Sequence, residues 1–281
     1  MIVLIIPVFN EEKKIKDVVK SVKRYCDELI IVNDGSNDHT KEILESLDGI
    51  TLVNHKSNQG IGSATKTGIK KAIEIGAEYI LKFDGDGQHM STDIPEFIKH
   101  LKEKNYDFVK GNRFQLSIEE MPLVKIIGNF VSTTLQKVVT GNFRISDPNN
   151  GFIAFRASIF DKVQYKYLRD DYFFENSLLM NLIVFKYKIA EVPIKTIYGD
   201  EKSSIPLFKG SVMLLPIFIK FLYLKNYLNA KYNLSIGSLI FAISNILIIL
   251  RVINPDFIEL GTIYIVCCLY VLIEVINFLN D

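Results

Sequence analysis

The C-terminal part of the chain contains two long, almost uniformly apolar stretches, and no other feature constrains the fold more. They run from Leu234 to Ile253 and from Phe257 to Leu279, with only Asn254-Pro255-Asp256 between them. As helices, both are long enough to cross a hydrocarbon core of about 30 Å. Two buried helices of a soluble domain are the alternative, but a surface helix of that kind keeps one wet face, which these stretches lack. Residues 234–281 are therefore predicted to form a transmembrane helical hairpin.

The preceding segment, residues 207–233, has the composition of an amphipathic helix that lies along a membrane surface. The run from Ser211 to Leu224 is apolar but is interrupted by Pro216 and Lys220, which suits an interfacial helix. Positive charge collects on the cytoplasmic side of membrane proteins, and four lysines precede the first span: Lys209, Lys220, Lys225 and Lys231. We therefore expect a multi-pass cell-membrane protein whose termini and soluble domain are cytoplasmic. Self-association would cover the two apolar helices.

Residues 1–206 show a different pattern, in which strand-like and helix-like segments alternate. Apolar and β-branched runs predict strands at 2–8, 29–32, 51–53, 79–83 and 108–109, and helical periodicity is found at 11–25, 41–47, 61–75 and 93–102. Beyond Arg113 we expect helices at 124–139 and 173–185, a short strand at 152–155, and a strand at 189–197 whose Pro193 favours an edge or a strand end. The alternation predicts an α/β domain, with βαβ units around a mostly parallel, doubly wound sheet.

The most informative polar motif directly follows the fourth predicted strand and reads Asp84-Gly85-Asp86-Gly87-Gln88. Open α/β sheets bind ligands at the carboxyl ends of their strands. Mg²⁺ takes one or two carboxylates together with substrate phosphates, and a glycine lets a ligand approach the backbone closely. A polar turn that only ends the strand is the alternative. His89, beside this motif, is the histidine that merits a test.

Two further polar clusters end the first and second predicted strands, so all three clusters should lie on one edge of the sheet. Pro7-Val8-Phe9-Asn10-Glu11 ends the first strand, and Asn33-Asp34-Gly35 ends the second. Phe9 suits packing on a nucleobase, while Glu11 and Asp34 suit hydrogen bonds from a base or ribose. Favourable charge at a helix N-terminus and turn chemistry explain each cluster singly. Three clusters on one rim favour a ligand site.

Two classes of function are disfavoured. Lys and Arg number 33 against 32 Asp and Glu, a net charge of +1, whereas a broad nucleic-acid-binding surface needs a basic excess. A nicotinamide-dependent oxidoreductase would need a third glycine after Gly60-Ile61-Gly62, where Thr65 stands, and would carry this motif after its first strand.

Eight motifs, in order along the chain, resemble those of glycosyltransferase family 2, and within it the dolichyl- and polyprenyl-phosphate sugar synthases. They are PVFNEE, IIVNDGSNDHT, NQGIGSATKTGI, LKFDGDGQH, KGNRF, SDPNNGF, AEVPI and YGDEKSS, and they span roughly the first three-quarters of the chain. The resemblance implies a GT-A fold over residues 1–206. In that fold an aspartate motif holds Mg²⁺ or Mn²⁺ against the diphosphate of a sugar nucleotide.

Carried over position by position, the resemblance also implies roles for individual residues. The nucleoside pocket would be lined by Pro7, Phe9, Glu11, Asn33 and Asp34, together with Asp84 and Gly85. Asp86 and Gln88 would bind the metal, with Asp84 near the ribose or donor sugar and acting on the metal through water. Four residues would carry the reaction, namely Asp84, Asp86, Arg113 and Lys202. Arg113 would face the phosphates of the donor or the acceptor, and Lys202 would pair with an acceptor phosphate.

The sequence departs from the family pattern at two positions. Asn33 stands where many relatives carry an aspartate, which would alter recognition of the base or ribose. Ser177 stands where a second acidic residue is expected, and Glu175 is a candidate to take over that role.

The chemistry implied is an inverting transfer at the cytoplasmic membrane face, from a GDP- or UDP-linked sugar to a polyprenyl or dolichyl phosphate. The leaving diphosphate needs its charge neutralised. A lipid phosphate is already largely ionised near neutrality, because its second pKa is about 6, so it needs little help from a base. A polysaccharide or another membrane glycan is the alternative acceptor. A further alternative is a non-catalytic sugar-nucleotide sensor or scaffold.

Overall fold

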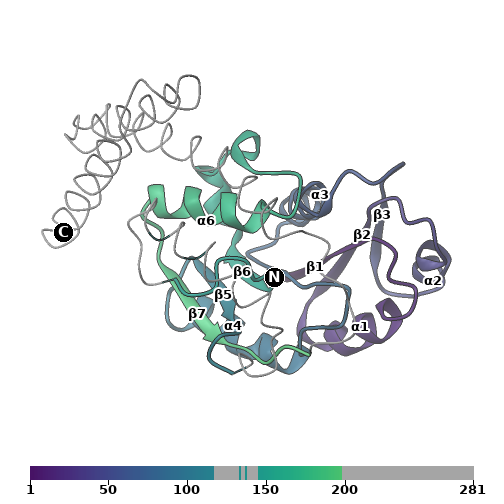
Figure 1. Ribbon diagram of the computed structural model, residues 1–281, viewed down its shortest axis with the longest axis horizontal. Coiled ribbons are helices and arrows are strands. Elements are labelled where there is room, and N and C mark those ends of the chain that lie inside the picture. Colours follow the sequence, from purple (N-terminus) through teal and green to yellow (C-terminus); the bar gives the residue numbers. More distant parts are fainter. Residues whose placement is uncertain (117–132, 134–136, 138–144, 198–281) are drawn as a thin grey trace, which may run out of the picture. The chain divides into compact units, whose positions relative to one another are not determined.

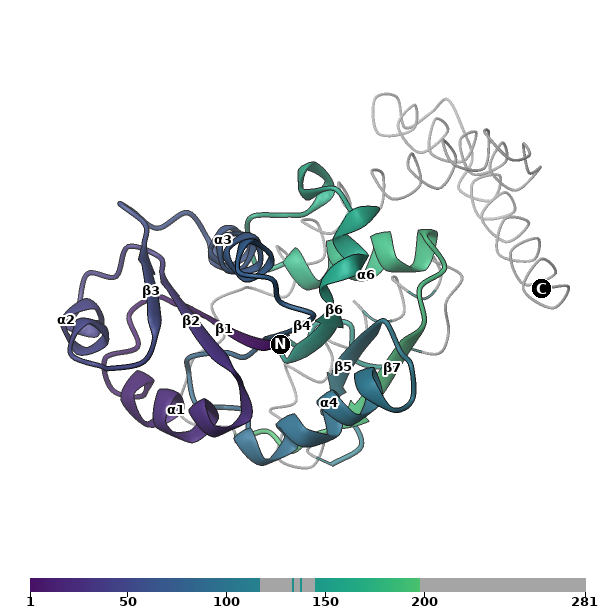
Figure 2. The same ribbon diagram turned by 180° about the vertical axis from the view of Figure 1, so that it is seen from behind.

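The computed structural model describes residues 1–116, 133, 137 and 145–197, and all of these except Lys137 belong to one compact unit. The unit is built on a seven-stranded sheet in the order β3-β2-β1-β4-β6-β5-β7 (Figures 1 and 2). The strands are β1 (Ile2–Val8), β2 (Glu28–Asn33), β3 (Thr51–Asn54), β4 (Tyr79–Lys82), β5 (Phe108–Asn112), β6 (Ile153–Arg156) and β7 (Ile189–Pro193). The α-helices are α1 (Ile15–Val22), α2 (Thr40–Glu45), α3 (Ile61–Glu74), α4 (Ile94–Lys102) and α6 (Phe174–Val184), and short 3₁₀ helices include η1 (Lys23–Tyr25) and η2 (Ser91–Asp93).

Strands β3, β2, β1 and β4 run parallel to one another, so their carboxyl ends meet at one edge. Strand β6 is antiparallel to both of its neighbours, β4 and β5, while β7 pairs parallel to β5 at the edge of the sheet. The predicted α/β class is confirmed, and β6 is the strand that reverses direction. Because β1 has β2 on one side and β4 on the other, the strand order changes direction there, which is where open α/β sheets bind ligands.

Helices cover both faces of the sheet, with α1, α2 and α4 on one face and α3 and α6 on the other (Figures 1 and 2). The sequence of β1 shows why. Leu4 and Ile6 enter the core under α1, while Val3 and Ile5 enter the core under α3. A strand buried on both faces reads as a continuous apolar run rather than an alternating one.

Most elements predicted for residues 1–206 that lie within the described part of the chain are present, with shifts of a few residues at their ends. The strand predicted at 189–197 ends at Pro193, which has no N–H to donate to a ladder. Beyond it the chain still reaches the Asp84–His89 loop, through a bridge between Thr196 and His89 and a bond from Ile197 N–H to the carbonyl of Gln88 (2.9 Å).

Several predictions concern other parts of the chain. The helix expected at 124–139, apart from helical Thr133 and Lys137, lies outside the described residues. The structure also does not describe the predicted surface helix, the two apolar spans, the domain boundaries at 206 and 233, or Lys202. Among the helices that the structure describes, none has the length and apolar character needed to cross a membrane.

Candidate functional site

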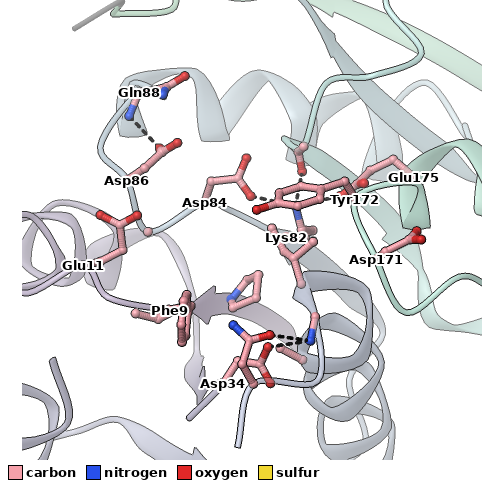
Figure 3. Close-up of a pocket in the computed structure, with 18 of the residues that line it drawn as sticks. Phe9, Glu11, Asp34, Lys82, Asp84, Asp86, Gln88, Asp171, Tyr172 and Glu175 are labelled. Atoms are coloured by element: carbon pink, nitrogen blue, oxygen red, sulfur yellow. Dashed lines mark hydrogen bonds and ion pairs between the residues drawn. The ribbon is translucent and has the colours of Figure 1, made fainter. Parts of the chain in front are cut away.

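A cavity of about 500 Å³ lies at the carboxyl ends of β1, β2 and β4. Figure 3 shows side chains from all three strand ends and from α6 converging on it. The wall includes eight of the residues predicted from the sequence: Pro7, Phe9, Glu11, Asp34, Asp84, Gly85, Asp86 and Gln88. The expectation that the polar clusters meet on one rim therefore agrees with the geometry, while the role of each residue stays a prediction.

The amine of Lys82 joins three segments at the base of this cavity. Its Nζ donates to Asp84 Oδ1 (2.7 Å), to Glu175 Oε1 of α6 (2.7 Å) and to the carbonyl of Gly151 (3.2 Å). The second oxygen of Asp84 accepts a bond from His89 Nε2 (3.1 Å). Since Lys82 is 1% exposed and Glu175 is 5% exposed, this ion pair is shielded from solvent, while the Asp84 side chain is 19% exposed.

Charge in the cluster is set by these contacts. Burial alone would raise the pKa of the Asp84 carboxyl, but the Lys82 amine and the bond from His89 outweigh it and hold that pKa well below its usual range. Burial would likewise lower the pKa of Lys82, but Asp84 and Glu175 outweigh it and hold that pKa above its usual value. Asp84 therefore stays a carboxylate and Lys82 stays a cation.

Asp86 and Gln88 lie together on the cavity wall, where the Gln88 N–H donates to Asp86 Oδ1 (2.9 Å). Within the described ranges, no group of three or more His, Cys, Asp or Glu side chains is arranged to hold a metal ion. The oxygen donors present suit a hard divalent cation that takes its remaining ligands from substrate phosphates and water. Asp86 and Gln88 therefore fit a cation that arrives with a nucleotide.

The cavity wall carries a large excess of negative charge. Its described residues include one amine, that of Lys82, against six carboxylates: Glu11, Asp34, Asp84, Asp86, Asp171 and Glu175. The amine is already bound to two of these carboxylates. An anionic diphosphate would be repelled by such a wall unless a cation entered with it.

Asp34 is buried, and three bonds fix its carboxylate. Oδ1 accepts from His55 Nδ1 (2.6 Å) and from the Gln59 N–H (3.0 Å), and Oδ2 accepts from the Gly60 N–H (2.8 Å). A carboxylate only accepts, so the proton of the His55 ring lies on Nδ1, and its Nε2 faces Thr67 Oγ1 (2.9 Å). Asp34 therefore holds the loop before α3 against the end of β2.

The other predicted nucleotide residues differ in position. Phe9 is 38% exposed on the cavity wall, as a stacking surface for a base requires. Asn33 is not among the lining residues, and its amide is used locally, since Nδ2 donates to Asn54 Oδ1 (2.9 Å) and Oδ1 accepts from the Ser36 N–H (3.1 Å). The presence of Asn33 in place of an aspartate thus affects the hydrogen bonds of a turn rather than the cavity wall.

Arg113 lies at the end of β5, and the cavity wall does not include it. Its guanidinium forms a two-pronged ion pair with buried Asp147. The predicted contact between Arg113 and phosphates stays a prediction, and the structure adds an anchoring role for this side chain.

Several residues of the wall were not predicted from the sequence, namely Lys82, Asn149, Gly151, Asp171 and Tyr172. Lys82 and Gly151 lie inside motifs that were recognised, so their positions were available even though their roles were not. Asp171 and Tyr172 precede α6 and carried no signal.

The two unusual positions of α6 have separate tasks. Glu175 faces the cavity and binds Lys82. Ser177 accepts the Arg169 N–H through Oγ (3.0 Å) and donates to the carbonyl of Phe174 (2.8 Å). The hydroxyl therefore fixes the segment that carries Asp171 and Tyr172 into the cavity.

Comparisons with known proteins agree with this geometry. The model of the family described as Glycosyl transferase family 2 matches residues 3–164. The chain is 34% identical over 219 residues to the UDP-N-acetylglucosamine–dolichyl-phosphate N-acetylglucosaminyltransferase of Methanococcus voltae, with 71% of this chain and 87% of that protein covered. An uncharacterised protein of Methanocaldococcus jannaschii is also 34% identical, over 206 residues that cover 72% of this chain and 84% of that protein.

Solved structures show the same fold. Glucosyl-3-phosphoglycerate synthase from Mycobacterium tuberculosis, in complex with Mn²⁺, UDP and phosphoglyceric acid, superposes with a TM-score of 0.61 at 18% identity. The superposition covers 80% of this chain and 78% of that one. Another crystal structure of glucosyl-3-phosphoglycerate synthase from M. tuberculosis gives a TM-score of 0.63 at 18% identity, covering 79% of this chain and 80% of that one. At this level of identity the likeness speaks for the fold alone.

Proposed function

This chain belongs to glycosyltransferase family 2 and is a glycosyltransferase with a GT-A-like α/β fold, and we propose that it transfers one sugar from a nucleotide-diphosphate sugar to a polyprenyl or dolichyl phosphate. The observation that carries the proposal is the meeting of Phe9, Asp34, Asp86 and Gln88 in one cavity at the switch point of the sheet. These side chains supply, in order, a stacking surface, a hydrogen-bond acceptor and two oxygen donors for a cation.

A divalent cation, Mg²⁺ or Mn²⁺, is part of the proposal. Asp86 and Gln88 would hold it, and it would neutralise the charge that develops on the departing diphosphate. The excess of carboxylates in the wall supports this requirement, since the Lys82 amine is already bound to Asp84 and Glu175. The predicted phosphate contacts of Arg113 and Lys202 would add to it.

The acceptor is proposed from chemistry and from kinship. The relative from Methanococcus voltae is named for transfer to dolichyl phosphate, and the match extends over 87% of its length. A phosphomonoester has a second pKa of about 6, so it reaches the anomeric carbon as an anion without a general base. Direct displacement of the diphosphate by this oxygen would invert the anomeric configuration.

The hydrogen bonds of Asp34 favour a uracil nucleotide as donor. A carboxylate oxygen accepts about two hydrogen bonds, so Oδ1 is filled by His55 and Gln59, whereas Oδ2 has one position left beside Gly60. Uracil presents a single N–H on its pairing edge. Guanine presents an N–H and an amino group side by side, which suit a carboxylate with both oxygens open. The UDP-linked donor named for the relative supports the same choice.

The proposed setting is the cytoplasmic face of the cell membrane, with residues 207–233 along the surface and residues 234–281 as the anchoring hairpin. The apolar composition of these segments supports it. A lipid phosphate would then reach the catalytic domain at the height of the headgroups.

The test is transfer of radiolabelled sugar into polyprenyl phosphate by the full chain in detergent, with a panel of UDP- and GDP-sugars and with Mg²⁺ or Mn²⁺. We expect a metal-dependent glycolipid from one UDP-sugar, and a loss of at least 100-fold with Asp86→Ala. Asp17→Ala, an exposed aspartate of α1 outside the cavity wall, is the matched control and should keep full activity.

Two other outcomes would replace the proposal. Sugar incorporated into a polymer but not into the lipid would identify a glycan acceptor. Metal-dependent nucleotide binding with no transfer from any donor would indicate a sensor or scaffold.

A further inference from the structure

Lys82 has no hydrogen-bonding capacity to spare for a substrate, although it lies in the wall of the cavity. An ammonium group has three N–H donors, and three acceptors lie within 3.2 Å of Nζ: Asp84 Oδ1, Glu175 Oε1 and the Gly151 carbonyl. Its backbone lies in the middle of the sheet, between Ile5 of β1 and Ile153 of β6. The amine is therefore fixed by strand pairing on one side and by three acceptors on the other.

The environment of Lys82 differs from that of the second fully buried lysine, Lys110. The amine of Lys110 donates to the carbonyl of Asn150 and forms no ion pair among the described residues. Lys82 instead binds carboxylates from two different elements, Asp84 after β4 and Glu175 on α6. A buried charge that is paired twice restricts the positions of both partners, because separating them leaves the buried amine without a counter-charge.

The backbone around the cluster leaves Asp84 little freedom. A Cβ at position 151 would lie 2.2 Å from Asp84 Oδ2 and 2.9 Å from the Lys82 amine, so a larger residue there would have to displace one of these side chains. Each oxygen of Asp84 already accepts a bond, from Lys82 or from His89. Rotating the Asp84 carboxylate out of this position would break its bonds with Lys82 and His89.

We propose that Lys82 is a positioning residue that ties Asp84 and Glu175 to one amine, keeps Asp84 from coordinating the cation directly, and so leaves the cation to Asp86 and Gln88. The inference rests on the proposed metal-dependent transfer. It explains why Asp84 and Asp86, which belong to one motif, would have different roles. Asp84 would then face the donor as a fixed hydrogen-bond acceptor.

The test is a titration of the full chain in detergent with Mn²⁺ alone, followed by electron paramagnetic resonance of the free ion. Lys82→Met removes the amine from Asp84 Oδ1 and leaves the bond from His89 on Oδ2. Oδ1 can then reach the ion beside Asp86, and a nearby positive charge is gone. We expect Mn²⁺ to bind at least about fivefold more tightly than to the wild type, while the turnover number for transfer falls at least about tenfold. Lys99→Met, an exposed lysine of α4, should change neither quantity.

Glu175→Gln supplies a background in case Lys82→Met does not fold. It removes one buried carboxylate and leaves Lys82 on Asp84, so its Mn²⁺ affinity should be equal to or weaker than that of the wild type. Adding Lys82→Met to this background removes the amine from Asp84 Oδ1 without leaving a buried carboxylate at position 175 unpaired. The double variant should bind Mn²⁺ more tightly than Glu175→Gln alone.

Equal or weaker Mn²⁺ binding after loss of Lys82, in either background, would overturn the proposal. A lysine that only supports the fold would give that result, because a loosened site binds a metal less well. No lipid takes part in the titration, so a wrong acceptor in the proposed function would leave this result unchanged. If the wild type bound no Mn²⁺ even with UDP, the metal requirement of the proposed function would fail separately.

Discussion

Arg113 and Asp147 form a forked ion pair that fastens the segment from Ser146 to Gly151 to the end of β5. Arg113 Nε lies 2.7 Å from Asp147 Oδ2, and Nη2 lies 2.8 Å from Oδ1. The backbone N–H of Arg113 also donates to Oδ2 (3.1 Å), and the Asp147 side chain is fully buried. From the other side, Glu191 Oε1 accepts the N–H groups of Ser146 and Asp147. The segment that supplies Gly151 to the cavity is thus held from two sides at its N-terminal end.

Replacing Arg113 should therefore cost stability. Arg113→Met leaves the buried Asp147 carboxylate without its ion-pair partner, a change that costs about 3–5 kcal/mol. A lower midpoint of thermal unfolding in detergent would show it, with Arg24→Met, an exposed arginine that stacks on Tyr25, as the control. A variant of unchanged stability that loses only nucleotide affinity would instead support the contact with phosphates predicted from the sequence.

The Arg113–Asp147 ion pair also determines how the free energy of unfolding should change with pH. Burial alone raises the pKa of Asp147, but Arg113 outweighs it and holds the folded pKa below its usual value. A depressed acid pKa stabilises the fold above the unfolded value of about 3.9, and that stability is lost as the pH falls through the folded pKa. The stability gap between the wild type and Arg113→Met should therefore narrow as the pH is lowered from 5 toward 3. A stability difference that stays constant over this pH range would contradict the prediction.

The buried lysine Lys110 should make stability depend on pH with the same sign, but at alkaline pH. Burial lowers the pKa of this lysine to about 8, whereas the unfolded value is about 10.4. Between these two values the unfolded chain binds more protons, so the free energy of unfolding should rise with pH. The rise should be absent in Lys110→Met. The measurement is the unfolding midpoint of the wild type and of Lys110→Met from pH 7 to 10. Parallel curves of midpoint against pH would show that Lys110 is not the group responsible.

The fold was predictable as far as local patterns determine it. The apolar run of β1 and the periodic apolar positions of α1 identify a strand covered on both faces and a helix with one buried side. The place of β6 was not predictable, because its reversal between β4 and β5 depends on contacts between residues far apart in the sequence. Short strands such as β6 have no local signal for direction.

The candidate site was predictable at positions where strand ends carry motifs. Asp84, Asp86 and Gln88 follow β4, and their meeting with Asp34 follows from parallel strands alone. Lys82 was missed because a lysine within a strand reads as an exposed side chain. Its burial becomes evident only when Glu175, from a helix far along the chain, is brought beside it.

The bond between His55 and Asp34 predicts a change in base preference. His55→Phe keeps a ring of similar shape but empties one position on Oδ1 of Asp34, and it loses a bond to a charged group worth about 1.5–3 kcal/mol. UDP affinity should fall about tenfold or more, and the preference for UDP over GDP should shrink. Calorimetric titration with each nucleotide and Mn²⁺ measures both effects.

Thr67→Val is the control for that substitution, because it removes the partner of His55 Nε2 and leaves the bond to Asp34 in place. It should weaken UDP binding less than His55→Phe does, with the base preference kept. Equal losses for UDP and GDP in His55→Phe would show that His55 supports the loop without affecting the choice of base.

Gly151 offers the most direct test of the geometry around Asp84. A methyl group at this position would meet Asp84 Oδ2 at 2.2 Å and the Lys82 amine at 2.9 Å, so Gly151→Ala must displace one of them. A misplacement of about 1 Å near the reacting atoms can cost about 100-fold in rate, and we expect a loss of that size in sugar transfer. Gly76→Ala is the control, since its Cβ would meet nothing within 4 Å and its φ of +84° imposes only backbone strain, about 1–2 kcal/mol. It should lower stability and leave transfer intact. Transfer near the wild-type rate in Gly151→Ala would mean that the reaction tolerates a displaced Asp84. The reaction would then not require this carboxylate in the position seen in the structure.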